Sequence, residues 1–176
     1  MPKIVHIINY KHMTATKQLS GKDNIQNIIN ELEDIVDNHP YFAFALLAII
    51  IEVFGKCYNS NPDWQLGDSS KKDFKSAIRK CSSLTKYKTI GDDVVYSTLR
   101  CGLLHAFLPK DGILLTEDKN DLKNNIIGCK SLYKDVIAAW NQIKIDPSIQ
   151  NKLTNNVLEI RNTITGTTES FINTIQ

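Results

Sequence analysis

Apolar residues recur every three or four positions along most of this chain, and short polar segments separate the apolar runs. This spacing places the apolar side chains on one face of an α-helix and the polar side chains on the opposite face. It predicts about six helices, over residues 24–37, 41–58, 70–83, 89–108, 131–144 and 146–164. We therefore expect an all-α helical bundle.

The predicted helix over residues 41–58 differs from the others because it is apolar on every side. Residues 42–51 form an unbroken apolar run, and Glu52 is the only charged residue between Pro40 and Lys56. Such a helix in a soluble protein either passes through the middle of the core or is covered by a second subunit. We expect it to be the central helix, with Glu52 buried beside a partner.

Short apolar runs indicate a minor β element. Residues 113–115 and 126–128 are two such runs joined by a polar stretch, which predicts a small β-hairpin after the fourth helix. At the N-terminus, residues 1–22 begin with the β-branched run 4–8, which predicts a short strand or an ordered arm. Residues 166–176 are mostly polar, and we expect this tail to fray.

Hydroxyl residues stand at three of the predicted helix starts. Ser70 with Asp73, and Thr89 with Asp92, have the spacing of a capping box. Ser131 precedes the apolar positions of the fifth helix and is expected to cap it. These residues predict where three helices begin.

The length of 176 residues suits one domain, so residues 1–176 are expected to fold as a single unit. A formal net charge of +2 argues against a protein coated in basic charge, but it leaves room for a local positive groove. The four cysteines lack the CxxC spacing of zinc or redox sites, and His6 and His12 lack metal-ligand spacing, so no metal or cofactor is expected. The apolar run 42–51 is shorter than the roughly 20 residues of a membrane span. We expect a soluble, cytoplasmic protein that does not bind a membrane.

One pair of residues has a definite chemical use. Arg100 and His105 lie in the mostly apolar run 96–108, which Pro109 closes. An arginine can hold a phosphate through its planar guanidinium, and a histidine can take or give a proton near neutral pH. Lysine outnumbers arginine 18 to 3 in this chain, which marks Arg100 as a specific choice. Five residues along an α-helix amount to a rotation of about 140°, so the two side chains share a groove only if the helix loosens, and Gly102 favours this.

Other interpretations of the same residues stay open. Arg100 can pair with the buried Glu52 in a structural role, while His105 stabilises the negative end of its helix. Glu52 can then serve either the structure or the orientation of a site. A third arrangement is a nucleophile at Ser97, Thr98 or Cys101 that acts with His105, and residues four apart on a helix share a face, as Cys101 and His105 would.

The segment Arg100-Cys101-Gly102-Leu103-Leu104-His105 resembles the Arg-x4-His motif of the higher eukaryotes and prokaryotes nucleotide-binding superfamily, HEPN. Tyr96, four residues before the arginine, adds to the resemblance. So does the earlier apolar helix, which carries an acidic residue and a glycine within residues 44–55. The resemblance covers roughly residues 40–143 and implies an all-α fold and a homodimer in which two motifs face each other.

In active members the resemblance implies a metal-independent endoribonuclease of the kind found in bacterial defence or toxin systems, with RNA or a nucleotide as ligand and an antitoxin-like partner. Arg100 would hold the scissile phosphate, His105 would act as general base or acid, and the product would carry a 2′,3′-cyclic phosphate. Glu52, Tyr96 and Cys101 would support the site. Cys101 stands where many active members have Asn, Asp or His, and a thiol is a weaker hydrogen-bond donor. A non-catalytic nucleotide- or partner-binding module, with Arg100 binding an anion or serving the structure, is the alternative.

Overall fold

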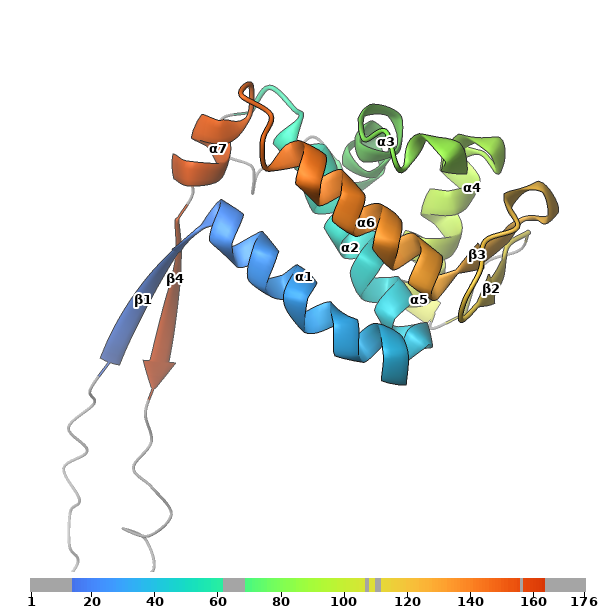
Figure 1. Cartoon of the computed structure of the whole chain (residues 1–176), viewed down its shortest axis with the longest axis horizontal. Coiled ribbons are helices and arrows are strands. Elements are labelled where there is room, and N and C mark those ends of the chain that lie inside the picture. Colours follow the sequence, from blue (N-terminus) through green and yellow to red (C-terminus); the bar gives the residue numbers. More distant parts are fainter. Residues whose placement is uncertain (1–13, 62–68, 107, 110–111, 156, 164–176) are drawn as a thin grey trace, which may run out of the picture.

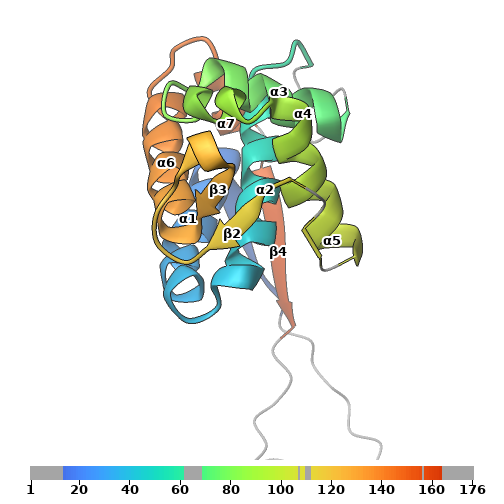
Figure 2. The same ribbon diagram turned by 90° about the vertical axis from the view of Figure 1, so that its right-hand side faces the viewer.

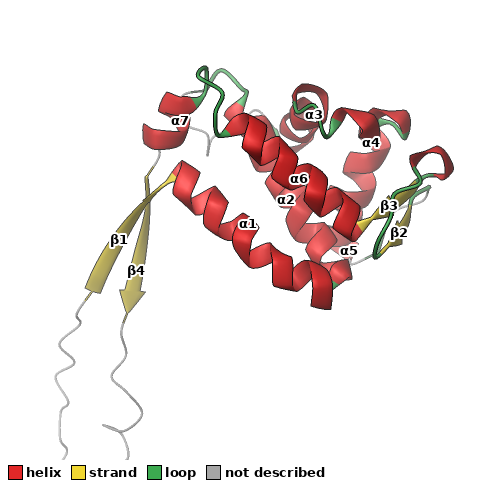
Figure 3. Cartoon of the chain, viewed as in Figure 1, coloured by secondary structure: helices red, strands yellow, loops and turns green. Residues whose placement is uncertain are grey.

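The computed structural model describes residues 14–61, 69–106, 108–109, 112–155 and 157–163, and it is mostly helical, as predicted (Figures 1 and 3). The α-helices are α1 Gly21–Asn38, α2 Pro40–Cys57, α3 Ser70–Lys80, α4 Asp92–Val95, α5 Leu103–Ala106, α6 Cys129–Ile143 and α7 Gln150–Asn155. A π-helical segment, Tyr96–Gly102, joins α4 to α5, and 3₁₀ turns lie at Thr85–Thr89 and Leu122–Asn124. His6, His12, the apolar run 4–8 and the tail 166–176 lie outside the described residues.

Helix α2 is the central helix, as its apolar composition predicted. It lies between α1 and α6 on one side and α3 with the α4–α5 segment on the other (Figure 2). Its side chains Phe44, Leu47, Ile51 and Phe54 are at most 2% exposed, and the Phe54 ring stacks on Trp140 of α6 with 6.0 Å between ring centroids. Among the described helices, α2 alone is long and apolar enough to cross a membrane, but 61% of it is buried inside the bundle. The α2 side chains therefore form the middle of the hydrophobic core.

Ser20 is the N-cap of helix α1. Its hydroxyl accepts a hydrogen bond from the backbone N–H of Asp23 at 3.1 Å, which satisfies one of the unpaired donors of the first turn. The apolar face of α1, including Ile25, Ile29 and Leu32, is buried against the core. The amphipathic helix predicted over residues 24–37 is thus confirmed.

The cap of α3 is one residue earlier than the capping-box spacing predicted. Ser69 accepts the hydrogen bond from the backbone N–H of Lys72 at 3.3 Å, so Ser69 is the N-cap. Ser70 instead donates its hydroxyl proton to Glu52 at 3.1 Å. The prediction for Ser70 was wrong because either of two adjacent serines can cap a helix. Ser70 binds the buried carboxylate of Glu52 instead, and Ser69 caps the helix.

Two further capping predictions are also wrong. The Thr89 hydroxyl donates to the carbonyl of Lys86 at 2.8 Å, and Gly91, with a φ of 103°, precedes the first residue of α4. The Ser131 hydroxyl donates to the carbonyl of Asp118 at 2.8 Å and lies inside α6. In both cases the hydroxyl donates to a backbone carbonyl outside the helix instead of accepting from an N–H of its first turn.

The small β element is present, but it is not the predicted hairpin. Strands β2 (Leu114–Thr116) and β3 (Ile126–Gly128) pair in parallel (Figure 2). The chain reverses once between β2 and Asp121 and again at a tight turn, where Asp121 and Ile126 exchange two antiparallel backbone hydrogen bonds of 3.0 and 2.8 Å. The second of these reversals gives β3 the direction of β2, which two apolar runs alone do not reveal.

The predicted last helix is also corrected. Only α7 is helical, and the chain then forms strand β4 (Val157–Thr163), which pairs antiparallel with β1 (Thr14–Ser20). The two strands project from the bundle as a ribbon (Figure 1). Apolar spacing at residues 149, 153, 157 and 160 fits a helix, but the β-branched residues of 157–163 also favour a strand once β1 is beside them. Strand β1 lies in the polar part of residues 1–22, whereas the apolar run 4–8, on which the expected strand or arm was based, lies outside the described residues.

Three buried thiols predict a loss of stability at alkaline pH. Burial raises the pKa of Cys57 and Cys129 to about 12 and that of Cys81 to about 11, from an ordinary 9.0. The pKa of these thiols is raised only in the folded state, so above pH 9 they ionise in the unfolded chain and stay protonated in the folded one. The folded protein therefore keeps its full stability below pH 9 and loses stability as the pH rises above 9. We expect the free energy of unfolding in urea to fall by about 2 kcal/mol or more between pH 8 and 10.5.

The variants Cys57→Ala and Cys129→Ala test this assignment. Each should make the stability less dependent on pH above pH 9, because one thiol no longer ionises on unfolding. Urea titrations followed by circular dichroism give the required free energies. An unchanged pH dependence in both variants would show that these thiols are not the cause.

Candidate functional site

Arginine Arg100 lies on the π-helical segment and pairs with Glu52 of the central helix. The distance from Arg100 Nε to Glu52 Oε2 is 2.6 Å, and the two side chains are 22% and 9% exposed. The apolar surroundings of α2 leave the carboxylate with 7% exposure for the whole residue, so it needs a cationic partner. The predicted pairing of Glu52 with Arg100 is confirmed.

Two residues that the sequence analysis missed complete the surroundings of Glu52. Ser70, the first residue of α3, donates to Oε1 at 3.1 Å, and Lys56 Nζ lies 3.7 Å from the same oxygen. Lys56 is four residues after Glu52 on α2, a spacing at which opposite charges pair. That spacing is a signal the sequence offered, whereas the contact with Ser70 depends on how α3 packs.

The pairing with Glu52 leaves part of the Arg100 guanidinium available. Glu52 engages the Nε atom, and in the described part of the chain it is the only hydrogen-bonding partner of the guanidinium. A guanidinium has five N–H donors in a planar fork, so the Nη groups can still bind an anion through two parallel hydrogen bonds. Glu52 therefore orients the cation through Nε, and no described residue is hydrogen bonded to its Nη groups.

The helix that carries Arg100 widens into a π-helix at the Arg-x4-His motif. Residues Tyr96–Gly102 are π-helical, and the Leu103 N–H bonds to the carbonyl of Thr98, five residues earlier. Such a turn holds one residue more than an α-turn, so each residue rotates less about the axis. The Arg100 and His105 side chains are then separated by less than the roughly 140° of an ideal helix. The loosening expected near Gly102 is confirmed.

Tyr96 and Cys101 lie beside Arg100. The Tyr96 ring meets Phe74 of α3 edge to face, with 5.5 Å between centroids. Burial raises the pKa of the Tyr96 hydroxyl, and its hydrogen-bonding contact with the Cys101 thiol raises it further. Cys101 is half-buried, whereas the other three cysteines are buried. The structure thus brings Glu52, Tyr96, Arg100 and Cys101 into one cluster.

His105 stands apart from this cluster. It lies on α5, in the last turn before Pro109, and its side chain is exposed. Among the described residues no hydrogen bond or ion pair joins its imidazole to another side chain, Cys101 and Glu52 included. The imidazole is therefore open to a ligand from solvent, and the arrangement gives no support to a thiol activated by His105.

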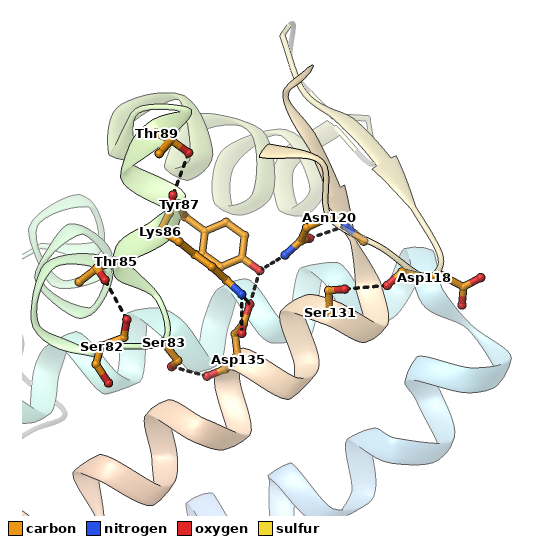
Figure 4. Close-up of polar contacts among 11 residues, drawn as sticks. Ser82, Ser83, Thr85, Lys86, Tyr87, Thr89, Asp118, Asn120, Ser131 and Asp135 are labelled. Atoms are coloured by element: carbon orange, nitrogen blue, oxygen red, sulfur yellow. Dashed lines mark hydrogen bonds and ion pairs between the residues drawn. The ribbon is translucent and has the colours of Figure 1, made fainter. Parts of the chain in front are cut away.

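A second polar cluster, which the sequence analysis missed, lies between α6 and the β2–β3 connection (Figure 4). The buried Tyr87 donates to Asp135 Oδ2 at 2.7 Å and accepts a hydrogen bond from Asn120 at 2.9 Å. Lys86 also binds Asp135, and Asn120 accepts the N–H of Gly128 at 2.8 Å. Burial, and then the Asp135 carboxylate, raise the pKa of Tyr87. Each of these groups is satisfied by its neighbours, so the cluster anchors the β element and offers no ligand site.

Comparison of the chain with protein-family models, with curated proteins and with solved structures finds no significant match. Within the described residues, no three histidine, cysteine or acidic side chains come together as a metal site. The function therefore has to be argued from the cluster around Arg100 and from the exposed His105.

Proposed function

We propose that this chain is a HEPN-like RNA-binding protein that cleaves RNA without a metal ion, using Arg100 and His105. The observation that carries the proposal is the Glu52–Arg100 pair, which holds a half-buried guanidinium by Nε while no described residue is hydrogen bonded to its Nη groups. The exposed imidazole of His105 five residues later supplies the second group that phosphodiester cleavage requires.

Arg100 is suited to bind and stabilise a phosphate. Its side chain is 22% exposed, so an RNA phosphate that reaches it loses part of its water and interacts more strongly with the fixed charge. In the transition state of cleavage, negative charge grows on the phosphate oxygens, and a pre-oriented guanidinium stabilises that charge. Glu52, Ser70 and Lys56 act here as positioning residues.

The proposed step is attack of a ribose 2′-oxygen on the neighbouring phosphorus. The bond from that oxygen to phosphorus forms, the bond from phosphorus to the 5′-oxygen breaks, and a 2′,3′-cyclic phosphate remains. His105 accepts the proton of the 2′-hydroxyl, and a second acid gives a proton to the departing 5′-oxygen. No redox step or metal-bound water is involved.

A homodimer supplies the second acid in this proposal, because each chain contributes the one histidine of its Arg-x4-His motif. Three exposed apolar side chains lie near the ends of the helices involved: Tyr41 and Phe42 at the start of α2 are 45% and 55% exposed, and Leu108 after α5 is 66% exposed. A second copy that covers such side chains would gain stability from their burial. Light scattering coupled to size-exclusion chromatography measures the oligomeric state directly.

RNA cleavage by the purified chain in the presence of EDTA tests the proposal. We expect the unmodified protein to cut a mixed-sequence RNA, and Arg100→Ala and His105→Ala each to reduce the rate by at least a hundredfold. His39→Ala is the matched control for histidine, because His39 is also exposed, and Arg79→Ala is the control for arginine. Circular dichroism shows which variants are folded.

The outcomes separate the two functions considered. Cleavage that survives His105→Ala contradicts the assigned chemistry. RNA or nucleotide binding that depends on Arg100, with no cleavage by any form, identifies instead a non-catalytic binding module. The absence of cleavage would be consistent with Cys101, because its thiol is a weaker hydrogen-bond donor than the Asn, Asp or His that many active members have at this position.

A further inference from the structure

Helix α3 presents two rows of cations to solvent. The helix carries five lysines and arginines, and with Ser76 they line a shallow hollow of about 430 Å³; these residues are Lys71, Lys72, Lys75, Arg79 and Lys80. Residues four apart on a helix lie on one line. The first row is therefore 71, 75 and 79, and the second is 72, 76 and 80.

Carboxylates of α4 neutralise much of the first row. Lys71 and Lys75 approach Asp93 at 2.8 and 2.7 Å, and Arg79 approaches Asp92 at 2.7 Å. Three cations thus face two carboxylates. This row fixes α3 against α4 and retains only a small excess of positive charge.

The second row keeps its charge. Lys72 and Lys80 are exposed, and neither has a carboxylate partner in the part of the chain that the structure describes. Lys80 lies over the ring of Tyr58, 5.1 Å from its centroid, and donates to the Tyr58 carbonyl at 3.3 Å, which fixes its position. The opposite side of α3, with Phe74 and Ile78, is buried in the core, so the charged row faces outward.

Helix α3, which carries this row, also contacts the proposed site. Ser70 opens α3 and donates to Glu52, which in turn holds Arg100. From Lys72 to Lys80 the helix rises about 12 Å. Lys72 and Lys80 therefore lie on the helix that contacts the Arg100 cluster, and they are separated by a distance that several consecutive phosphates of a single strand can span.

We infer that the outer face of α3, through Lys72 and Lys80, binds the RNA phosphates that flank the scissile one. The inference rests on the proposed function, since it names the path of the same substrate. Regular spacing and a hydroxyl between the two lysines suit a phosphate backbone. No described residue of α3 is both apolar and exposed, so the face has nothing to insert into a membrane or to form an apolar protein interface.

Fluorescence anisotropy measures this binding apart from cleavage. The probe is a labelled 12-nucleotide RNA with 2′-O-methyl riboses, which cannot attack its own phosphates. We expect Lys72→Glu/Lys80→Glu to weaken binding at least tenfold at 50–100 mM salt and to make the slope of log K against log salt shallower by about 1.4, the effect of two lost phosphate contacts. Lys123→Glu/Lys134→Glu changes two exposed lysines elsewhere by the same charge, and it should stay within about threefold of the unmodified protein.

Parallel assays distinguish failure of the inference from failure of the proposed function. If the α3 variant binds like the unmodified protein, or if both double variants weaken binding equally, the inference is wrong even where Arg100→Ala abolishes cleavage. If binding depends on Lys72 and Lys80 but no form cleaves RNA, the inference stands and the nuclease does not. Binding to phosphatidylserine vesicles without binding to the RNA probe overturns both.

Discussion

Replacing Gly55 by alanine is expected to lower the free energy of unfolding by about 3 kcal/mol or more, because there is no room for a side chain. A Cβ atom at this position on α2 would lie 1.6 Å from the carbonyl oxygen of Asp73 and 2.8 Å from its Cα. These are backbone atoms of α3, so α3 itself must move. The higher helix propensity of alanine, worth about 1 kcal/mol, does not compensate.

A matched substitution isolates the steric part of this effect. Gly91→Ala is the same chemical change at a position where the nearest atom, Val94 Cγ2, is 3.6 Å away. Its φ of 103° strains an alanine and costs about 1–2 kcal/mol. Urea unfolding should therefore find Gly55→Ala the less stable variant. If it is as stable as Gly91→Ala, α2 and α3 do not pack as closely as described, and the contact of Ser70 with Glu52 loses its basis.

Truncating Arg100 to alanine is expected to lower the free energy of unfolding by about 2–3 kcal/mol. Glu52 would remain nearly buried with Ser70 and Lys56 as its remaining donors. In the double variant Arg100→Ala/Glu52→Gln the buried charge is gone. Its loss of unfolding free energy should therefore be smaller than the sum of the losses in the two single variants, by about 1 kcal/mol or more. A thermodynamic cycle of urea-unfolding free energies measures this coupling.

An exposed ion pair provides the control for this cycle. Arg79 also pairs with an aspartate, Asp92, at 2.7 Å, but its side chain is 56% exposed. Arg79→Ala should cost less than about 1 kcal/mol, because solvent screens such pairs. Additive effects of Arg100→Ala and Glu52→Gln would mean that the pair does not hold the guanidinium in place, and the proposed orientation of Arg100 would fail with it.

The burial of α2 and the pairing of Glu52 with Arg100 could be predicted from the sequence, because each depends on the types of a few residues. A run of ten apolar residues has to be covered on every side, either by the core or by a second subunit, which favoured α2 as the central helix. A single carboxylate in that helix needs a cation, and Arg100 is the arginine that sits in another apolar helix. The loosened turn at Gly102 followed from the rotation between Arg100 and His105 on an ideal helix.

Features that depend on tertiary partners could not be predicted in this way. Residues 157–163 are strand because β1 lies alongside, and their apolar spacing fits a helix equally well. The parallel pairing of β2 and β3 depends on the tight turn between Asp121 and Ile126. The hydroxyls predicted to cap helices, those of Ser70, Thr89 and Ser131, could bind either the helix start or another acceptor. Which of the two they bind depends on the packing of the folded chain.

The Tyr87–Asp135–Asn120 cluster was missed for the same reason. Its members come from three separate segments, which are far apart in the sequence and meet only in the folded chain (Figure 4). A buried tyrosine needs a partner for its hydroxyl, but nothing in its local sequence names that partner.

The most direct test of the central claim is the chemical identity of the cleaved RNA ends in EDTA. If Arg100 holds the phosphate and His105 activates the ribose hydroxyl, mass spectrometry should find a 2′,3′-cyclic phosphate on the upstream fragment and a free 5′-hydroxyl on the downstream one. The same RNA with 2′-O-methyl riboses should be bound and left intact. A 5′-phosphate on the downstream fragment, cleavage of the methylated RNA, or no cleavage of either substrate would contradict the account.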